Sequence, residues 1–329
     1  MSRVLVLSDS LREQLPAVEA LERSGHEVEW IDGLTPFALL GRDLSAVEAV
    51  VTGRVMGVDD AALSLMPNLR VLALHTSGSD NVDLSAATAR GVVVTNVKGV
   101  NAEVCAEFSL ALILAVTRQV RTGDLAIRAG EWAARTQSSL DLYGATLGVV
   151  GLGLIGKAGV RRAAAFGMRI LCHTRTPDYE FGKKYGVDWC DLGTVLRESD
   201  VVSLYASLNS QTRRMIGAQE IALMKPTAFL VNIARGELID EPALVDALRD
   251  RRIAGAALDV FEEEPLFESP LFALDNVVLT PHQAGLAQGA KVAAAQRAVN
   301  NALTALEGRL PPDAINPDAW GRPGTEALA

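Results

Sequence analysis

Short apolar runs and helical patterns alternate along the first hundred residues. The runs are rich in Val, Ile and Leu, and segments of helical periodicity follow most of them, as at Leu11–Ser24 and Ala61–Met66. This alternation predicts a parallel sheet covered by helices on both faces. The predicted strands are Val4–Ser8, Glu27–Ile31, Ala49–Thr52, Arg70–His75 and Val92–Thr95.

The same alternation resumes after a long apolar stretch. Asn101–Arg128 has a helical pattern with few polar positions, and a polar loop follows at Gly130–Leu142. We expect 101–128 to be one helix buried on nearly all sides, because an all-apolar helix has no face suited to water. Strands of a second sheet are predicted at Leu147–Val150, Arg169–Thr174, Val187–Cys190, Val201–Ala206, Ala228–Ile233, Gly255–Val260 and Val277–Thr280.

The last part of the chain predicts a helix and then a tail. Ala287–Glu307 has a helical pattern rich in Ala and Val, and we expect it to return to the first domain. Four prolines follow Leu310 with little other pattern, which predicts a wrapping or loose end. With 329 residues the chain suggests two domains.

Three glycines after the Leu147–Val150 strand have the spacing G-x-G-x-x-G. Gly151 allows a tight turn, Gly153 lets the backbone approach a pyrophosphate, and Gly156 lets the next helix lie close to the strand. The helix that follows offers unpaired N–H groups and the positive end of its dipole to phosphates. A strand before the motif and a helix and strand after it predict a dinucleotide site.

The end of the second strand of this unit bears on the choice of cofactor. An acidic residue there usually accepts hydrogen bonds from the ribose 2′-OH of NAD. Here Thr174, Arg175 and Thr176 stand instead, and no carboxylate occurs before Asp178. Arginine forms paired, charge-assisted hydrogen bonds to phosphate. We therefore expect NADP(H) to be preferred, with NAD(H) possible if Thr174 contacts the 2′-OH.

Charge and cysteine content narrow the class of protein. Lys plus Arg number 31 and Asp plus Glu 40, a net charge of −9, which argues against nucleic acid or a membrane surface as partner. The apolar run Phe108–Val116 is too short to span a bilayer. Three cysteines without metal-ligand spacing predict no metal site, and with a strand at the N-terminus they favour a cytoplasmic protein.

The ordered motifs of the whole chain resemble the D-isomer-specific 2-hydroxyacid dehydrogenase family, of the glyoxylate/hydroxypyruvate reductase type. The resemblance implies an α/β fold of two Rossmann- or flavodoxin-like domains with doubly wound parallel sheets, and a homodimer. It implies a substrate-binding domain at 1–98 plus 287–329 and an inserted dinucleotide-binding domain at 99–286. The matching segments are HTSGSDNVDL at 75–84, NVKGVNAEVCAE at 96–107, GLGLIG at 151–156, NIARGELIDEPALVDAL at 232–248, ALDVFEEEPL at 257–266 and LTPH at 279–282.

The resemblance also implies roles for single residues. Arg235 would bind the substrate carboxylate and the C2 oxygen, His282 would be the acid/base, and Glu264 would pair with His282. Ser77 and Gly78 would bind substrate, with His75 next to them. The expected cofactor-binding residues are Gly151, Gly153, Leu154, Ile155, Gly156, Thr174, Arg175, Thr176, Ser207, Thr212, Ile233, Ala234, Asp259 and His282.

Elementary chemistry supports the proposed set of Arg235, Glu264 and His282. Hydride transfer to a 2-keto acid builds negative charge on the C2 oxygen, which needs a proton donor and a positive charge nearby. Histidine exchanges protons near neutral pH, a neighbouring carboxylate orients it, and arginine stays charged throughout. The three residues follow three predicted strands, where ligands of open α/β sheets bind.

Departures from the family pattern leave more than one function open. Ser207 stands where many members have proline, Tyr205 replaces a usual histidine, and Gln283 is an unusual polar neighbour of His282. A phosphite-oxidising branch has a lysine in the loop corresponding to His75–Asn81, which this chain lacks. Besides reduction of a small 2-keto acid, the sequence is compatible with a short phosphoglycerate dehydrogenase and with an NAD(P)H-sensing corepressor or scaffold.

Overall fold

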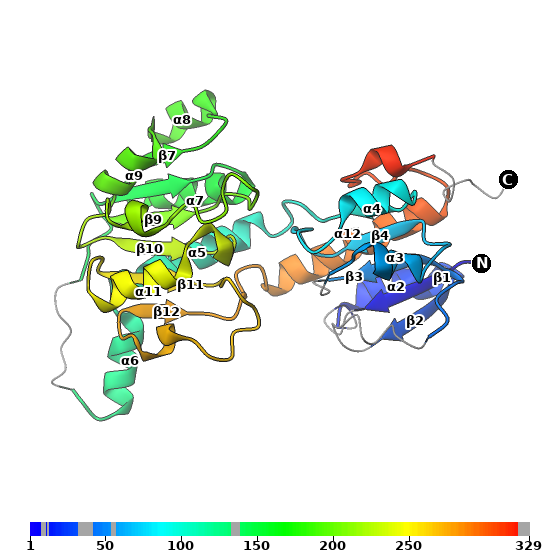
Figure 1. The fold of residues 1–329 in the computed structure, drawn as a ribbon, viewed down its shortest axis with the longest axis horizontal. Helices are drawn as coiled ribbons and strands as arrows, with labels where there is room; N and C mark the ends of the chain where they lie inside the picture. Colours follow the sequence, from blue (N-terminus) through cyan, green and yellow to red (C-terminus); the bar gives the residue numbers. More distant parts are fainter. Residues whose placement is uncertain (8–10, 12, 32–41, 54–56, 133–138, 322–329) are drawn as a thin grey trace. The chain divides into compact units, whose positions relative to one another are not determined.

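The chain forms two compact units, one inserted in the other. The computed structural model describes residues 1–7, 11, 13–31, 42–53, 57–132 and 139–321. Residues 1–101 and 287–329 make up the terminal unit, and residues 102–286 make up the central unit (Figure 1). Both units contain a parallel sheet with intervening helices, so the predicted fold class is confirmed.

The terminal unit is built on a five-stranded parallel sheet of order β2-β1-β3-β4-β5. The predicted strands are found within one or two residues of their expected ends, although Ser8 lies outside the described residues. The strands are β1 (Arg3–Leu7), β2 (Glu27–Ile31), β3 (Val47–Thr52), β4 (Val71–Leu74) and β5 (Val93–Thr95). The helices are α2 (Leu15–Arg23), α3 (Asp60–Ser64), α4 (Leu84–Ala89) and α12 (Gln288–Leu306).

Helix α12 joins the sheet of the terminal unit, as the sequence predicts. It packs on β3, β4 and α2. Its inward face consists largely of alanine, whose small side chain lets the helix lie close to the strands. The buried residues of this face are Ala295, Ala298, Val299, Ala302 and Ala305.

The described part of the tail, residues 311–321, is bound to the edge strand β5. Ile315 N–H donates to the carbonyl oxygen of Val94 at 2.9 Å. The amide of Asn316 accepts from Val94 N–H at 2.7 Å and donates to the carbonyl oxygen of Val92 at 2.9 Å. These bonds satisfy backbone groups that an edge strand would otherwise expose. A short 3-10 turn, η4 (Pro317–Ala319), follows.

The central unit contains a seven-stranded parallel sheet of order β12-β11-β10-β9-β6-β7-β8. This is the Rossmann order, and it reverses between β6 and β9. The strands are β6 (Thr146–Val150), β7 (Arg169–His173), β8 (Val187–Trp189), β9 (Val201–Leu204), β10 (Phe229–Asn232), β11 (Gly255–Leu258) and β12 (Val277–Leu279). The helices are α5 (Ala102–Thr117), α6 (Val120–Arg128), α7 (Leu154–Ala165), α8 (Tyr179–Tyr185), α9 (Leu192–Glu198), α10 (Ala218–Ile221) and α11 (Glu241–Arg249). The 3-10 turns are η2 (Gly236–Leu238) and η3 (Pro270–Ala273).

The prediction of a single buried helix over 101–128 is wrong. The segment forms α5 (Ala102–Thr117) and α6 (Val120–Arg128), separated at Gln119, whose φ of 54° is left-handed and cannot continue a right-handed helix. Helix α5 is largely buried. Helix α6 has no buried residue, and three of its positions, Arg121, Asp124 and Arg128, are charged.

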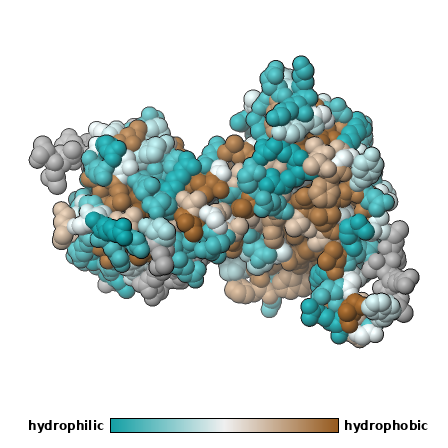
Figure 2. Space-filling view, turned by 180° about the vertical axis from the view of Figure 1, so that it is seen from behind, coloured by the Kyte–Doolittle hydropathy of each residue, from teal (hydrophilic) through white to brown (hydrophobic). Residues whose placement is uncertain are grey.

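Apolar side chains of α6 reach the surface. Val120 and Ile127, about two turns apart and so on one side of the helix, are 58% and 54% exposed, and Leu125, on another side, is 49% exposed. Figure 2 shows apolar residues gathered over one face of the central unit. Within the described parts of the chain, none of the helices has the length and apolarity needed to cross a bilayer.

Candidate active site

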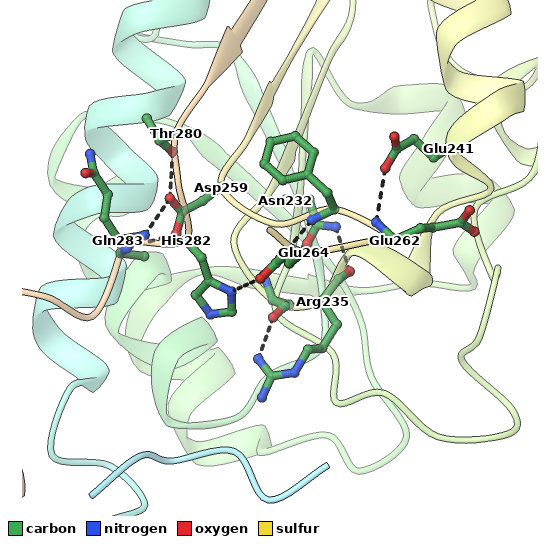
Figure 3. A network of polar contacts seen from close by, with 12 residues as sticks. Asn232, Arg235, Glu241, Asp259, Glu262, Glu264, Thr280, His282 and Gln283 are labelled. Atoms are coloured by element: carbon green, nitrogen blue, oxygen red, sulfur yellow. Dashed lines mark hydrogen bonds and ion pairs between the residues drawn. The ribbon is translucent and has the colours of Figure 1, made fainter. Parts of the chain in front are cut away.

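The three residues expected to carry the chemistry lie on loops that leave neighbouring strands of the central sheet. Arg235 follows β10, Glu264 follows β11 and His282 follows β12, and these strands are adjacent in the sheet. Parallel strands place their carboxyl ends at one edge, so the loops meet there. Figure 3 shows the ring of His282 and the side chain of Arg235 extending to the same side of these loops.

His282 and Glu264 form a hydrogen-bonded pair. Nδ1 of His282 lies 2.8 Å from Oε2 of Glu264 (Figure 3). The other carboxylate oxygen of Glu264, Oε1, accepts from Phe261 N–H at 3.0 Å. The Glu264 side chain is 13% exposed and the His282 side chain 35%. Because a carboxylate accepts hydrogen bonds, Nδ1 carries a hydrogen, and Nε2 is the nitrogen available to exchange a proton with a substrate.

The backbone of His282 is held in an uncommon conformation by Asp259. His282 has a φ of 50°, in the left-handed region, and its N–H donates to the carbonyl oxygen of Asp259 at 2.8 Å. The Asp259 carboxylate is fully buried and accepts from Thr280 Oγ1 at 2.6 Å, Gln283 N–H at 2.9 Å and Ala284 N–H at 2.8 Å. Asp259 thus shapes the turn that aims the His282 ring, a role that its predicted contact to the cofactor does not include.

Asn232 does for the Arg235 loop what Asp259 does for the His282 loop. Its fully buried side chain donates to the carbonyl oxygen of Arg235 at 2.8 Å and accepts from Ala234 N–H at 3.0 Å. The amide therefore closes a tight turn directly before the arginine. Asn232 was not among the residues predicted from the sequence. A polar side chain at the end of an otherwise apolar strand is the feature that could have indicated its role.

Close backbone contact brings the Arg235 loop to the loop that bears Glu264. A Cβ atom at Gly236 would lie 1.9 Å from the carbonyl carbon of Phe261, so only glycine fits. Arg235 NH1 donates to the carbonyl oxygen of Ala234 at 2.7 Å, which constrains the guanidinium. A permanent cation and a carboxylate-bound imidazole are thereby fixed on adjoining loops, which suits an anionic substrate that takes up a proton.

The glycine-rich turn fits the pyrophosphate of a dinucleotide. Gly151 has a φ of 94°, and a Cβ there would lie 2.6 Å from the backbone nitrogen of Ala206. A Cβ at Gly156 would lie 2.4 Å from the carbonyl oxygen of Gly151, whereas one at Gly153 would meet no described atom within 4 Å. The first and third glycines thus permit close packing, and the second leaves open space in front of the backbone.

The N-terminus of α7 completes this cradle. Gly153 is the N-cap and supplies no side-chain cap, and the first intrahelical bond runs from Lys157 N–H to the carbonyl oxygen of Gly153. The backbone N–H groups of the first turn, including those of Leu154 and Ile155, are therefore oriented as a helix N-terminus orients them toward phosphate oxygens. Ile233 and Ala234 follow β10, at the same sheet edge.

The residues predicted to bind the adenosine part of the cofactor differ in exposure and in hydrogen bonding. Thr174 is half-buried, Arg175 and Thr176 are exposed, and in the described part of the chain the Arg175 guanidinium has no hydrogen-bond partner. Ser207 is exposed. The Thr212 hydroxyl donates to the carbonyl oxygen of Ser207 at 2.7 Å, so it closes its own loop.

The predicted substrate residues of the terminal unit follow β4. The ring of His75 packs on Gly53, where a Cβ would lie 2.7 Å from its Nε2, and burial lowers the pKa of His75 so that the ring is neutral. Ser77 Oγ donates to Asn101 Oδ1 at 2.8 Å. Within the described residues, the N–H groups of Ser77 and Gly78 donate to no acceptor, which leaves two adjacent donors for an anion.

Comparison with a family model settles the family. The model of the D-isomer specific 2-hydroxyacid dehydrogenase NAD binding domain matches residues 110–284. The chain belongs to the D-isomer-specific 2-hydroxyacid dehydrogenase family. It is an NAD(P)-dependent oxidoreductase that interconverts 2-keto and 2-hydroxy acids.

Full-length relatives and solved structures agree with this assignment. Glyoxylate reductase of Thermococcus litoralis is 39% identical over 302 residues, 89% of this chain and 91% of the relative. Glyoxylate reductase of Pyrococcus furiosus is 43% identical over 277 residues, 82% of each chain. The NADPH-dependent glyoxylate/hydroxypyruvate reductase of Sinorhizobium meliloti, solved with NADP and malonate, superposes with a TM-score of 0.85 at 30% identity, covering 97% of this chain and 98% of that one.

Proposed function

We propose that this dehydrogenase reduces glyoxylate, or a 2-keto acid of similar size such as hydroxypyruvate, with NADPH. The observation that carries the proposal is the meeting of Arg235 and the His282–Glu264 pair on adjoining loops of a dinucleotide-binding sheet. The names of the relatives support the substrate class, since two of them are glyoxylate reductases.

The chain's own residues account for binding and for the proton. A bound reduced nicotinamide supplies the hydride to C2. The Arg235 guanidinium binds the substrate carboxylate and stabilises the charge that grows on the C2 oxygen. The imidazolium form of His282 gives its Nε2 proton to that oxygen and becomes the neutral Nδ1–H tautomer. Glu264, bound to Nδ1, orients the ring and compensates the charge of the imidazolium. Hydride and proton together convert the keto group to a hydroxyl.

Two smaller parts of the proposal concern the terminal unit. The N–H groups of Ser77 and Gly78 bind the substrate carboxylate, which their lack of acceptors among the described residues supports. His75 contacts the substrate as a neutral hydrogen-bonding ring, consistent with its lowered pKa. None of these three residues supplies the proton.

Arg175 is the basis for preferring NADPH to NADH. It is exposed, follows β7 and lies between two threonines, a combination suited to a 2′-phosphate. Both carboxylate oxygens of Asp259 already accept hydrogen bonds from the His282 turn. A contact to the nicotinamide carboxamide would therefore add a further hydrogen bond to one of these oxygens. Ser207 and Thr212 would line the site through the loop that they close.

The exposed apolar residues of α6 support a homodimer as the form in solution. Val120 and Ile127 lie on one side of the helix, are more than half exposed, and suit contact with a second copy of the chain. All three cysteines are free, which fits the expected cytoplasmic location.

A panel of 2-keto acids assayed with NADPH and with NADH tests the proposal. We expect the highest kcat/KM with glyoxylate or hydroxypyruvate and NADPH. A preference for NADH would overturn the cofactor part. Turnover of phosphite with NADP would favour a phosphite-oxidising enzyme, and binding of cofactor without turnover of any keto acid would favour an NAD(P)H sensor.

A further inference from the structure

The first carboxylate after β7 is held by two partners. Asp178 is the N-cap of α8, and its Oδ1 accepts from Phe181 N–H at 3.0 Å. Its other oxygen, Oδ2, accepts from Lys157 Nζ at 2.5 Å. The position of the carboxylate is therefore fixed by α8 on one side and by α7 on the other.

Lys157 belongs to the first turn of α7, at the edge of the predicted pyrophosphate cradle. Its backbone N–H makes the first intrahelical bond, to Gly153. Its ammonium group also lies 5.5 Å from the centre of the Phe181 ring, so it is held against α8 by charge and by the aromatic face together. Helices α7 and α8 are neighbours (Figure 1).

The charge of the Lys157–Asp178 pair can affect which cofactor binds. Asp178 stands three residues after Arg175, the residue proposed to bind the 2′-phosphate of NADP. The hydrogen bond from Lys157 lowers the pKa of Asp178, so the carboxylate is ionised at neutral pH. An ionised carboxylate without a partner close to that site would repel a dianionic phosphate and favour the hydroxyl of NAD.

We propose that Lys157 is a specificity-determining residue, which neutralises Asp178 and keeps it on the α8 cap so that the 2′-phosphate of NADP is accepted beside Arg175. The inference rests on the proposed function, in which the 174–176 segment binds the adenosine end. It differs from that proposal in assigning part of the preference to an ion pair that does not itself bind the phosphate.

A double-mutant cycle on this ion pair tests the inference by binding rather than turnover. Lys157→Met removes the charge and keeps an apolar stem against Phe181. Asp178→Asn removes the carboxylate and keeps a good N-cap. Dissociation constants of NADPH, NADH, adenosine 2′,5′-bisphosphate and AMP are measured by calorimetric titration of the purified variants, whose folding is checked by circular dichroism.

We expect Lys157→Met to weaken NADPH and the bisphosphate roughly 5-fold while NADH and AMP change less than about 2-fold. Asp178→Asn added to Lys157→Met should restore most of the lost affinity, because the repelling charge is gone. Lys183→Met is the matched control: it removes an exposed lysine of α8 without breaking this pair, and should leave the NADPH to NADH ratio unchanged.

The possible outcomes separate the inference from the proposed function. Equal losses in Lys157→Met and Lys183→Met, or no recovery in the double variant, would overturn the role of the pair. If the wild type preferred NADH, only the assignment of NADPH as cofactor would be overturned. The effect of Lys157→Met on the ratio of the NADPH and NADH affinities is measured whichever cofactor the wild type prefers.

Discussion

His75 and His282 occupy corresponding places in the two units but have opposite surroundings. Each follows a strand at the carboxyl edge of a parallel sheet. The His75 ring packs on Gly53 and burial lowers its pKa, whereas the His282 ring is bound by the Glu264 carboxylate at 2.8 Å. In the proposed function, the Glu264 carboxylate is what suits His282 rather than the buried His75 to acid/base chemistry.

The loops around the two histidines differ in the same way. In the central unit, buried polar side chains shape the turns: Asp259 binds the turn of His282 and Asn232 the turn of Arg235. In the terminal unit, Asn96 donates to the carbonyl oxygen of Ser77 at 2.9 Å and the loop presents backbone N–H groups. The central unit thus fixes charged side chains, and the terminal unit offers neutral donors.

Among the variants that probe the difference between the two units, Arg235→Ala should have the largest effect. Loss of two charge-assisted hydrogen bonds at about 2 kcal/mol each corresponds to roughly 10³-fold in kcat/KM for the keto acid. Arg235→Lys keeps the charge but not the paired geometry and should recover only part of the loss. Steady-state kinetics with saturating NADPH measure both. Full activity of the alanine variant would remove Arg235 from the site.

Glu264→Gln separates the charge of the partner from its shape. Glutamine can still accept a hydrogen bond from Nδ1 but does not compensate the charge of a protonated ring. We expect kcat to fall roughly 10- to 100-fold, the range for a lost hydrogen bond to a charged group. The dissociation constant of NADPH should not change. A kcat equal to that of the wild type would mean that His282 needs no carboxylate.

His75→Gln tests the histidine of the terminal unit. Because His75 is proposed to bind substrate as a neutral ring, we expect KM for the keto acid to rise roughly 2- to 10-fold and kcat to stay within about 2-fold. The split between KM and kcat is the informative quantity. A loss in kcat comparable to that of the Glu264 variant would show that the two histidines share the proton chemistry.

The lowered pKa of His75 also predicts a dependence of stability on pH. Its usual pKa is 6.5, and the folded protein holds the ring neutral. Below that pH the unfolded chain binds the proton and the folded chain does not. The neutral His75 ring therefore carries no penalty to folding above pH 6.5, and the free energy of unfolding decreases as the pH falls from 6.5 toward the folded pKa. The slope is at most about 1.4 kcal/mol per pH unit.

Urea unfolding at several pH values tests this dependence. The free energy of unfolding of wild type should fall below pH 6.5 more steeply than that of His75→Gln, which lacks the titrating ring. Parallel curves for the two proteins would show that His75 is not held neutral. This is the smallest of the expected effects, since one group contributes only part of the total pH dependence.

The sequence predicted the features that repeat along the chain or depend on one residue type. The two parallel sheets follow from alternating patterns, and the three glycines from the steric needs of the turn at 151–156. Arg235, Glu264 and His282 were placed at strand ends, and the structure brings Glu264 and His282 into contact.

What the sequence did not reveal depends on tertiary contacts. Asn232 and the turn-holding role of Asp259 become visible only when their loops meet, because the partners are backbone groups that every residue possesses. The break between α5 and α6 rests on a left-handed backbone at Gln119, a residue type common inside helices. Pairing of Lys157 with Asp178 joins two helices whose contact no spacing rule gives.

Turnover of His282→Ala, measured together with NADPH binding, tests the central claim most directly. The claim is that the imidazole bound to Glu264 supplies the proton for reduction of a 2-keto acid. It predicts a fall in kcat of roughly 10²- to 10⁴-fold with an unchanged dissociation constant for NADPH. A kcat within a few-fold of wild type, with cofactor bound as before, would contradict it.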